Sequence, residues 1–279
     1  MYGTPEQEGI APRAINELFR LAETMQGRHT VSVTASMVEL YNNTLIDLLR
    51  PVGRVREACP KLSLKHDHLG VVQIENIAER EAPNAAELKA LLQKGLSHRT
   101  VAANAMNIES SRSHLIFTIR ATSRNRVTGE TYTGKLLLCD LGGSERLKKS
   151  ESSGHQRKEA IEINKSLSAL GDVVEAVARR QKQVPYRNHK LTQIMQDSIG
   201  GTAKTLMFVN CSPARQSLSE TTMSLMYAAR VKRITNAGSP SCAPSSSGSP
   251  ASPARRTPGS SASAPPSASP FGFTPARGA

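Results

Sequence analysis

Two acids, two glycines and a serine follow a short apolar run in the stretch Leu136–Glu145, which reads LLLCDLGGSE. An apolar run bounded by glycines predicts a buried strand, here one of a parallel sheet. Open α/β sheets bind ligands just beyond the carboxyl ends of their strands. An aspartate at such a place can hold a hydrated Mg²⁺, and a glycine amide can approach a phosphate closely. The stretch therefore indicates phosphate chemistry, although a strand and a tight turn without any ligand would give the same letters.

A second polar stretch, Asn107–His114, reads NIESSRSH and precedes the strand-like run Leu115–Ile119. Taken alone it is typical of a polar loop. The combination N-x-x-S-S-R-S-H, followed about one strand pair later by D-L-x-G-S-E-R, is far more specific than either part. Together the two stretches resemble the two switch loops of the kinesin motor domain. The downstream stretches Ile163–Asp172 and Val184–Thr192 agree with this resemblance.

The resemblance runs from Met1 to about Asn236 and is closest to the C-terminal-motor class, particularly its calmodulin-binding members in plants, algae and protists. It implies an α/β fold, the three-layer P-loop NTPase fold of kinesins. It also implies a microtubule-stimulated ATPase that moves along microtubules, with ATP and Mg²⁺ as cofactors, at the microtubule cytoskeleton or spindle in the cytoplasm. The class suggests movement toward the minus end. A coiled-coil neck that would set the direction and hold a homodimer is not encoded in these residues.

The resemblance assigns metal and nucleotide contacts to particular residues. Ser110 would help to hold Mg²⁺, and Asp140 would anchor the water shell of the same ion. Ser110, Ser113 and Asp140 would together form the cofactor-binding set of this chain.

The resemblance also assigns catalytic roles. Ser111 would lie beside the γ-phosphate and the attacking water, and the amide of Gly143 would sense the γ-phosphate. Arg112 and Glu145 would form an ion pair when the two loops close. Gly142 stands where the family motif has alanine, which adds backbone freedom next to Gly143.

A phosphate-binding loop of the form G-x-x-x-x-G-K-[ST] occurs nowhere in the sequence. Gly200–Thr205 only imitates it, because the glycine spacing fails and alanine precedes Lys204. In kinesins the loop lies just upstream of the segment that Met1–Pro5 resembles, so we expect an incomplete motor fold that lacks the first strands. Two hypotheses remain open: the C-terminal part of a microtubule-stimulated ATPase, and a nucleotide-incompetent fragment that binds microtubules.

Basic residues follow the second switch loop and recur on the helices after it. Tubulin has an acidic surface, so such bases would steer docking in a salt-sensitive way. A charge run is more often only a solvated surface, and it is the resemblance that favours filament binding. The predicted microtubule-binding residues are Arg146, Lys149, Lys165, Arg187 and Lys190.

Bulk composition excludes several other classes. The 279 residues carry a net charge of +13, which favours polyanionic partners. Aromatic residues make up only 4%, which argues against a single-strand nucleic-acid platform. No apolar run approaches a bilayer span, and no G-x-G-x-x-G indicates a dinucleotide enzyme. We therefore expect neither membrane nor nucleic acid as a partner.

Local patterns predict the elements that position these stretches. Apolar residues recur at helical spacing in Gly9–Met25 and alternate at strand spacing in Thr30–Tyr41. Capping boxes are predicted at Asn84 with Glu87 and at Ser217 with Glu220. We expect further strands at Leu115–Ala121, Leu136–Asp140 and Leu206–Cys211, a long helix from Glu159, and a final helix after Ser217.

Composition changes near Ala237, beyond which serine, proline, alanine and glycine dominate. Such a segment cannot bury enough apolar surface to offset the entropy of ordering it. We therefore expect a motor part at 1–236 and a disordered tail at 237–279.

Overall fold

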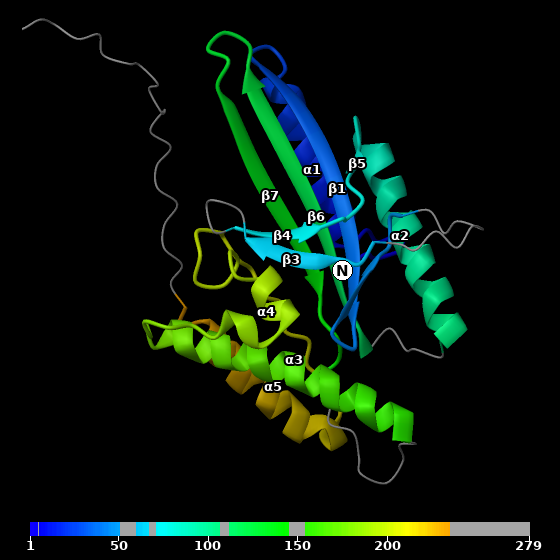
Figure 1. Cartoon of the computed structure of the whole chain (residues 1–279), viewed down its shortest axis with the longest axis vertical. Helices are drawn as coiled ribbons and strands as arrows, with labels where there is room; N and C mark the ends of the chain where they lie inside the picture. The colour runs from blue at the N-terminus through cyan, green and yellow to red at the C-terminus, as the bar shows by residue number, and fades with distance from the viewer. Residues whose placement is uncertain (5, 51–59, 67–70, 107–111, 145–153, 235–279) are drawn as a thin grey trace, which may run out of the picture. The chain divides into compact units, whose positions relative to one another are not determined.

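An antiparallel sheet built on three long strands forms the centre of the structure (Figure 1). The computed structural model describes residues 1–4, 6–50, 60–66, 71–106, 112–144 and 154–234, all within one unit that spans Met1–Ser239. The strand order is β2-β1-β6-β7, and β5 also pairs with β1. These strands are β1 (His29–Tyr41), β2 (Thr44–Asp47), β5 (Arg80–Glu81), β6 (His114–Asn125) and β7 (Thr131–Asp140). A separate hairpin consists of β3 (Ser63–His66) and β4 (Val72–Glu75).

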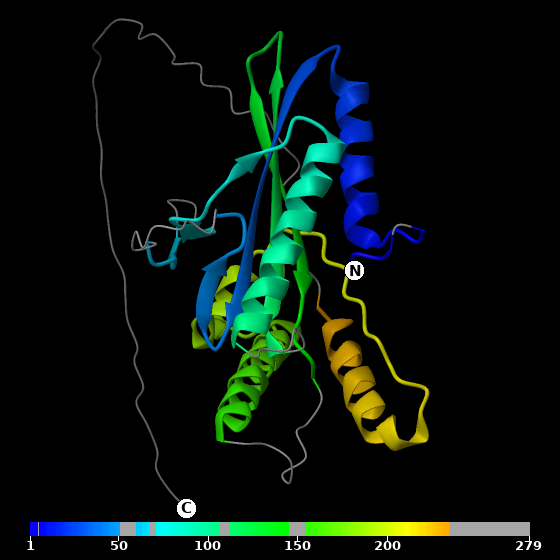
Figure 2. The same cartoon turned by 90° about the vertical axis from the view of Figure 1, so that its right-hand side faces the viewer.

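Helices cover both faces of this sheet. They are α1 (Ile10–Met25), α2 (Ala85–Met106), α3 (Gly154–Ala178), α4 (Lys190–Ile194) and α5 (Leu218–Val231). Two single 3-10 turns lie at Tyr186–Asn188 and Arg215–Ser217. In both views α1 and α2 run alongside the long strands, whereas α3 and α5 gather near the start of β6 and the end of β7 (Figures 1 and 2). None of the described helices has the length and apolar composition that a bilayer crossing requires.

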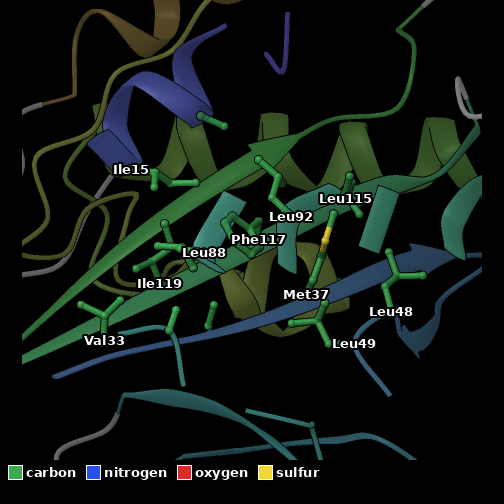
Figure 3. Close-up of a cluster of buried hydrophobic side chains, with 13 residues drawn as sticks. Ile15, Val33, Met37, Leu48, Leu49, Leu88, Leu92, Leu115, Phe117 and Ile119 are labelled. Atoms are coloured by element: carbon green, nitrogen blue, oxygen red, sulfur yellow. The ribbon is translucent and has the colours of Figure 1, made fainter. Parts of the chain in front are cut away.

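Alternation along β6 divides the core into two layers. Leu115, Phe117 and Ile119 point to the side of α1 and α2, where they pack with Ile15 and Leu88 (Figure 3). The residue between the first two, Ile116, points the other way. It packs there with apolar residues of α3 and α4, among them Leu170, Val174 and Leu191. The predicted three-layer arrangement follows from this period of two.

Several predicted elements are confirmed. α1 begins at Ile10 directly after Gly9, and β1 ends at Tyr41. The turn that follows holds Asn42 and Asn43 at φ +47° and +56°, a left-handed conformation that asparagine tolerates in a two-residue hairpin turn. Asn84 caps α2, because its Oδ1 accepts the N–H of Glu87 at 2.9 Å and its amide donates back to Glu87 Oε1 at 3.2 Å.

The prediction of a buried, parallel strand at Leu136–Asp140 is wrong in both respects. β7 pairs antiparallel with β6, because the short turn between them leaves no room for the crossover that a parallel pair needs. Among the described residues β7 pairs with β6 alone. Its residues Thr131–Leu136 are therefore exposed, and Leu137–Asp140 are only half-buried.

Two further local predictions are also wrong. Residues 206–211 form no strand, and Leu206 and Phe208 are 77% and 59% exposed. Ser217 precedes α5 but its side chain makes no capping hydrogen bond. The preceding 3-10 turn holds Ser217 at φ −96° and ψ 9°, whereas a capping side chain requires extended backbone.

Candidate functional site

The described parts of the two polar stretches, Arg112–His114 and Asp140–Ser144, lie at one end of the sheet. β6 begins at His114 and β7 ends at Asp140, and in their antiparallel register Leu115 lies opposite Asp140. Arg112 and Ser113 therefore enter the sheet where Leu141–Ser144 leave it (Figure 1). Hairpin geometry thus brings together two segments that are about 28 residues apart in sequence.

A buried arginine from α2 ties this end of the sheet together. Nε of Arg99 lies 3.2 Å from Oε1 of Glu39 on β1, and Nη2 donates to the carbonyl oxygen and hydroxyl of Ser113 at 3.2 and 3.0 Å. The Ser113 hydroxyl donates to the same Glu39 oxygen at 2.5 Å. Nη1 of Arg99 lies 3.6 Å from Oδ2 of Asp140. One guanidinium therefore faces two carboxylates and fixes the backbone just before β6.

His114 makes a second connection at the same place. The N–H of Gly142 donates to Nδ1 of His114 at 2.9 Å, and Nε2 lies 2.7 Å from the hydroxyl of Ser166 on α3. The imidazole is only 3% exposed. Burial, and then the positive charges of His189 and Arg99, lower the pKa of His114 to about 4, so the ring is neutral.

The carboxylate of Asp140 is chemically suited to a magnesium water shell. It ends β7, its side chain is 41% exposed, and hard oxygen ligands of this type are what Mg²⁺ prefers. Ser113 is fully buried and its hydroxyl is bonded to Glu39 and Arg99. A contact between Ser113 and a nucleotide stays a prediction, and it would require this hydroxyl to leave Glu39.

The remaining predicted catalytic residues divide into two groups. Arg112 is half-buried and lines a small cavity with His114, Glu162 and His189. Gly143 is also half-buried, and it directly follows Gly142, whose amide bonds to His114. The others lie outside the described residues. They are Ser110, Ser111 and Glu145, together with the predicted filament contacts Arg146 and Lys149.

The predicted filament contacts that the structure describes lie on neighbouring elements. Lys165 stands on α3 with a side chain that is 59% exposed, and Arg187 lies exposed in the turn Tyr186–Asn188. Lys190 begins α4, but its Nζ donates to the carbonyl oxygen of Asn43 at 2.7 Å. The hydroxyl of Thr192 donates to the carbonyl oxygen of Tyr186 at 2.6 Å and so joins the turn to α4.

The sequence contained a signal for the buried network that the motifs did not reveal. Arg99 continues the apolar helical spacing of Leu92 and Leu96, and Glu39 continues the inward alternation of Met37. A charged residue at a core position of a predicted element calls for a partner, because an unpaired buried charge is costly. Which partner it meets depends on tertiary contacts that no local pattern contains.

Known proteins that are similar in sequence and fold show the family of this chain. The family model described as "Kinesin motor domain" matches residues 1–234. The rice protein "Kinesin-like protein KIN-14I" is 48% identical over 244 residues, which are 88% of this chain and 19% of that protein.

Two solved structures agree with this match. A structure titled as that of a fast kinesin aligns with a TM-score of 0.79 at 35% identity, over 88% of this chain and 70% of that one. The structure of the C-terminal motor and motor homology domain of Kar3Vik1 aligns with a TM-score of 0.70 at 36% identity, over 80% and 57%. The chain spans about a fifth of the length of its curated KIN-14 relative. It therefore belongs to the kinesin motor domain family, and its similarities fall in the C-terminal-motor class.

Proposed function

We propose that this chain forms the switch-loop and filament-binding part of a motor that uses ATP hydrolysis to move along microtubules. The observation that carries the proposal is the junction at the ends of β6 and β7. There Asp140 lies 3.6 Å from Arg99, and hydrogen bonds join the Gly142 amide through His114 to Ser166 on α3. Phosphoryl transfer depends mainly on positioning and charge stabilisation, so such a junction can link a phosphate site to another surface.

In this proposal each side chain has a limited task. When bound, Mg·ATP would supply the phosphoanhydride bond and the metal charge. Ser110 and Asp140 would hold the ion and its water shell, while the Gly143 amide would face the terminal phosphate. Ser111 would orient water, and Arg112 with Glu145 would hold the two loops closed.

The filament side rests on Lys165, Arg187 and their neighbours on α3 and α4. Both side chains are exposed, and both elements pack on the same face of the sheet. Together with Arg146, Lys149 and Lys190 they would meet the acidic surface of tubulin. This places the protein on the microtubule cytoskeleton, with the spindle and a homodimeric assembly as further inferences from the class.

The second candidate is a fragment that binds microtubules without hydrolysing ATP. It is favoured by one specific observation, the lack of the G-x-x-x-x-G-K-[ST] loop in these residues. The two candidates differ in nucleotide chemistry and agree on filament binding.

An ATPase comparison separates them. The 279-residue chain is compared with a chimera in which the preceding motor segment of the rice KIN-14I relative is joined to Met1, each with and without microtubules. The motor proposal expects hydrolysis in the chimera that microtubules stimulate at least about tenfold, by analogy with other phosphoryl-transfer enzymes whose partners complete the site. A folded chimera that binds microtubules but shows no stimulated hydrolysis would favour the second candidate.

A further inference from the structure

The hydrogen bonds of His114 fix a single form of its ring. The backbone N–H of Gly142 can only donate, so Nδ1 must accept and carries no hydrogen. The hydroxyl of Ser166 donates its one hydrogen to the carbonyl oxygen of Ile163 at 2.6 Å. Its oxygen must therefore accept from Nε2 of His114. A neutral imidazole with its hydrogen on Nε2 satisfies every partner.

This arrangement makes a continuous path between two separate elements. The path runs from the Gly142 amide through the His114 ring to Ser166 and ends at Ile163, one turn earlier on α3. Ser166 is 1% exposed, whereas the neighbouring Lys165 points outward with a side chain that is 59% exposed. Ser166 is therefore the residue through which a displacement of α3 near Lys165 would act on the imidazole.

The path also depends on the position of one proton. A neutral imidazole has one donor and one acceptor nitrogen, and the partner at one nitrogen sets the role of the other. Gly142 requires Nδ1 to accept, and Ser166 stabilises the same form of the ring by accepting the hydrogen on Nε2. If the Ser166 oxygen moves away, the ring loses one of its two hydrogen bonds and is held less firmly against the Gly142 N–H.

We propose that His114 is a positioning residue that couples α3 to the Leu141–Ser144 turn through the two hydrogen bonds of its ring. The coupling role rests on the proposed function, because it links the filament side of α3 to the turn predicted to face the phosphate. The hydrogen-bond path itself does not depend on that function.

The path is tested first in the free 279-residue chain by hydrogen exchange, followed in peptides that cover Leu141–Ser144. Ser166→Ala removes the acceptor for Nε2 with little change in volume. The imidazole is then held by Gly142 alone, and the Gly142 amide is expected to exchange at least about fivefold faster, a change of the size that the loss of one buried hydrogen bond produces. Ser168→Ala, an exposed serine on the same helix, is the matched control and should leave the exchange as in the parent. Unchanged exchange in Ser166→Ala would overturn the proposal.

The coupling is tested by repeating the measurement with microtubules present. In the parent chain filament binding is expected to change exchange in Leu141–Ser144 by at least about twofold, as a bound partner shifts local opening. In Ser166→Ala the chain should still sediment with microtubules while this change is lost. A change of equal size in Ser166→Ala would overturn the coupling role. A folded chain that does not bind microtubules at all would instead overturn the proposed function, and the free-chain measurement would still decide whether the path exists.

Discussion

Among single residues, the buried Arg99 is within ion-pair distance of two carboxylates, those of Glu39 and Asp140. Its side chain is 9% exposed and lies between Glu39, which is 4% exposed, and Asp140. Removing one partner of a buried ion pair leaves the other charge unsolvated. We expect Arg99→Met to lower the free energy of unfolding by about 3–5 kcal/mol, as urea denaturation would measure.

A double variant tests this explanation. Replacing both charges in Arg99→Met with Glu39→Leu removes the stranded carboxylate, so part of the lost stability should return. Arg20→Met, which breaks an exposed ion pair with Glu17 on α1, is the surface control and should change stability little. If the double variant were no more stable than Arg99→Met, the stranded charge would not be the cause of the loss.

His114 gives the fold a dependence on pH. The pKa of its ring is about 4 in the folded chain and 6.5 as the reference for the unfolded chain. Between these two pH values the unfolded chain binds a proton that the folded chain does not. The contribution of His114 to the free energy of unfolding is therefore fully present above pH 6.5 and is lost as the pH falls toward 4. The slope from this one group is at most about 1.4 kcal/mol per pH unit.

Comparison with His114→Asn isolates that contribution. Burial also lowers the pKa of His189, and this residue and the carboxylates add the same pH dependence to both proteins. The difference between the free energies of unfolding of the two proteins, measured in urea at each pH, therefore reports His114. The variant is expected to lose less stability than the parent between pH 6.5 and 4. Parallel curves would show that the ring does not titrate as its burial implies.

At the scale of elements, the start of α2 is held by a reciprocal cap. Asn84 Oδ1 accepts the backbone N–H of Glu87, a donor that the first turn would otherwise leave free, and the Asn84 amide donates to the Glu87 carboxylate. Asn84→Ala should cost about 1 kcal/mol, within the usual range of 0.5–2 for a lost N-cap. Thermal or urea unfolding measures it. Ser217→Ala is a matched control, because Ser217 precedes α5 without a capping bond, and an equal loss there would contradict the assignment.

Elements whose signals are local could be predicted from the sequence. The apolar spacing of α1, the alternation of β1 and the Asn84 cap depend on neighbouring residues, and the structure confirms all three. The outcomes at β7 and at Leu206–Cys211 depend on which strand lies alongside, and this is not encoded within the segments themselves. The junctions made by Arg99 and His114 join residues up to 60 positions apart, so only the tertiary structure shows them.

At the scale of the whole molecule, apolar segments remain uncovered within the described residues. One edge of β7 pairs with no described strand, and Leu136 is exposed on this strand. Leu206 and Phe208 are exposed in the segment after α4. Unpaired edges and apolar segments promote self-association. We expect the apparent molar mass from static light scattering to rise with concentration, and we expect the double variant Leu206→Lys and Phe208→Lys to reduce this rise. Scattering that the substitutions leave unchanged would place the contact elsewhere.

In the proposed function, this kinesin-family chain binds microtubules through the basic residues Lys165 of α3 and Arg187 of the turn before α4. The most direct measurement is sedimentation of the folded 279-residue chain with microtubules, at low salt and at about 150 mM, where exposed charges are screened beyond roughly 8 Å. The double charge reversal Lys165→Glu and Arg187→Glu is compared with Arg20→Glu and Arg13→Glu on α1. The account predicts salt-sensitive binding that the first pair weakens at least about tenfold and the second pair leaves close to the parent. Equal binding by both double variants, or no binding by the folded parent at low salt, would contradict it.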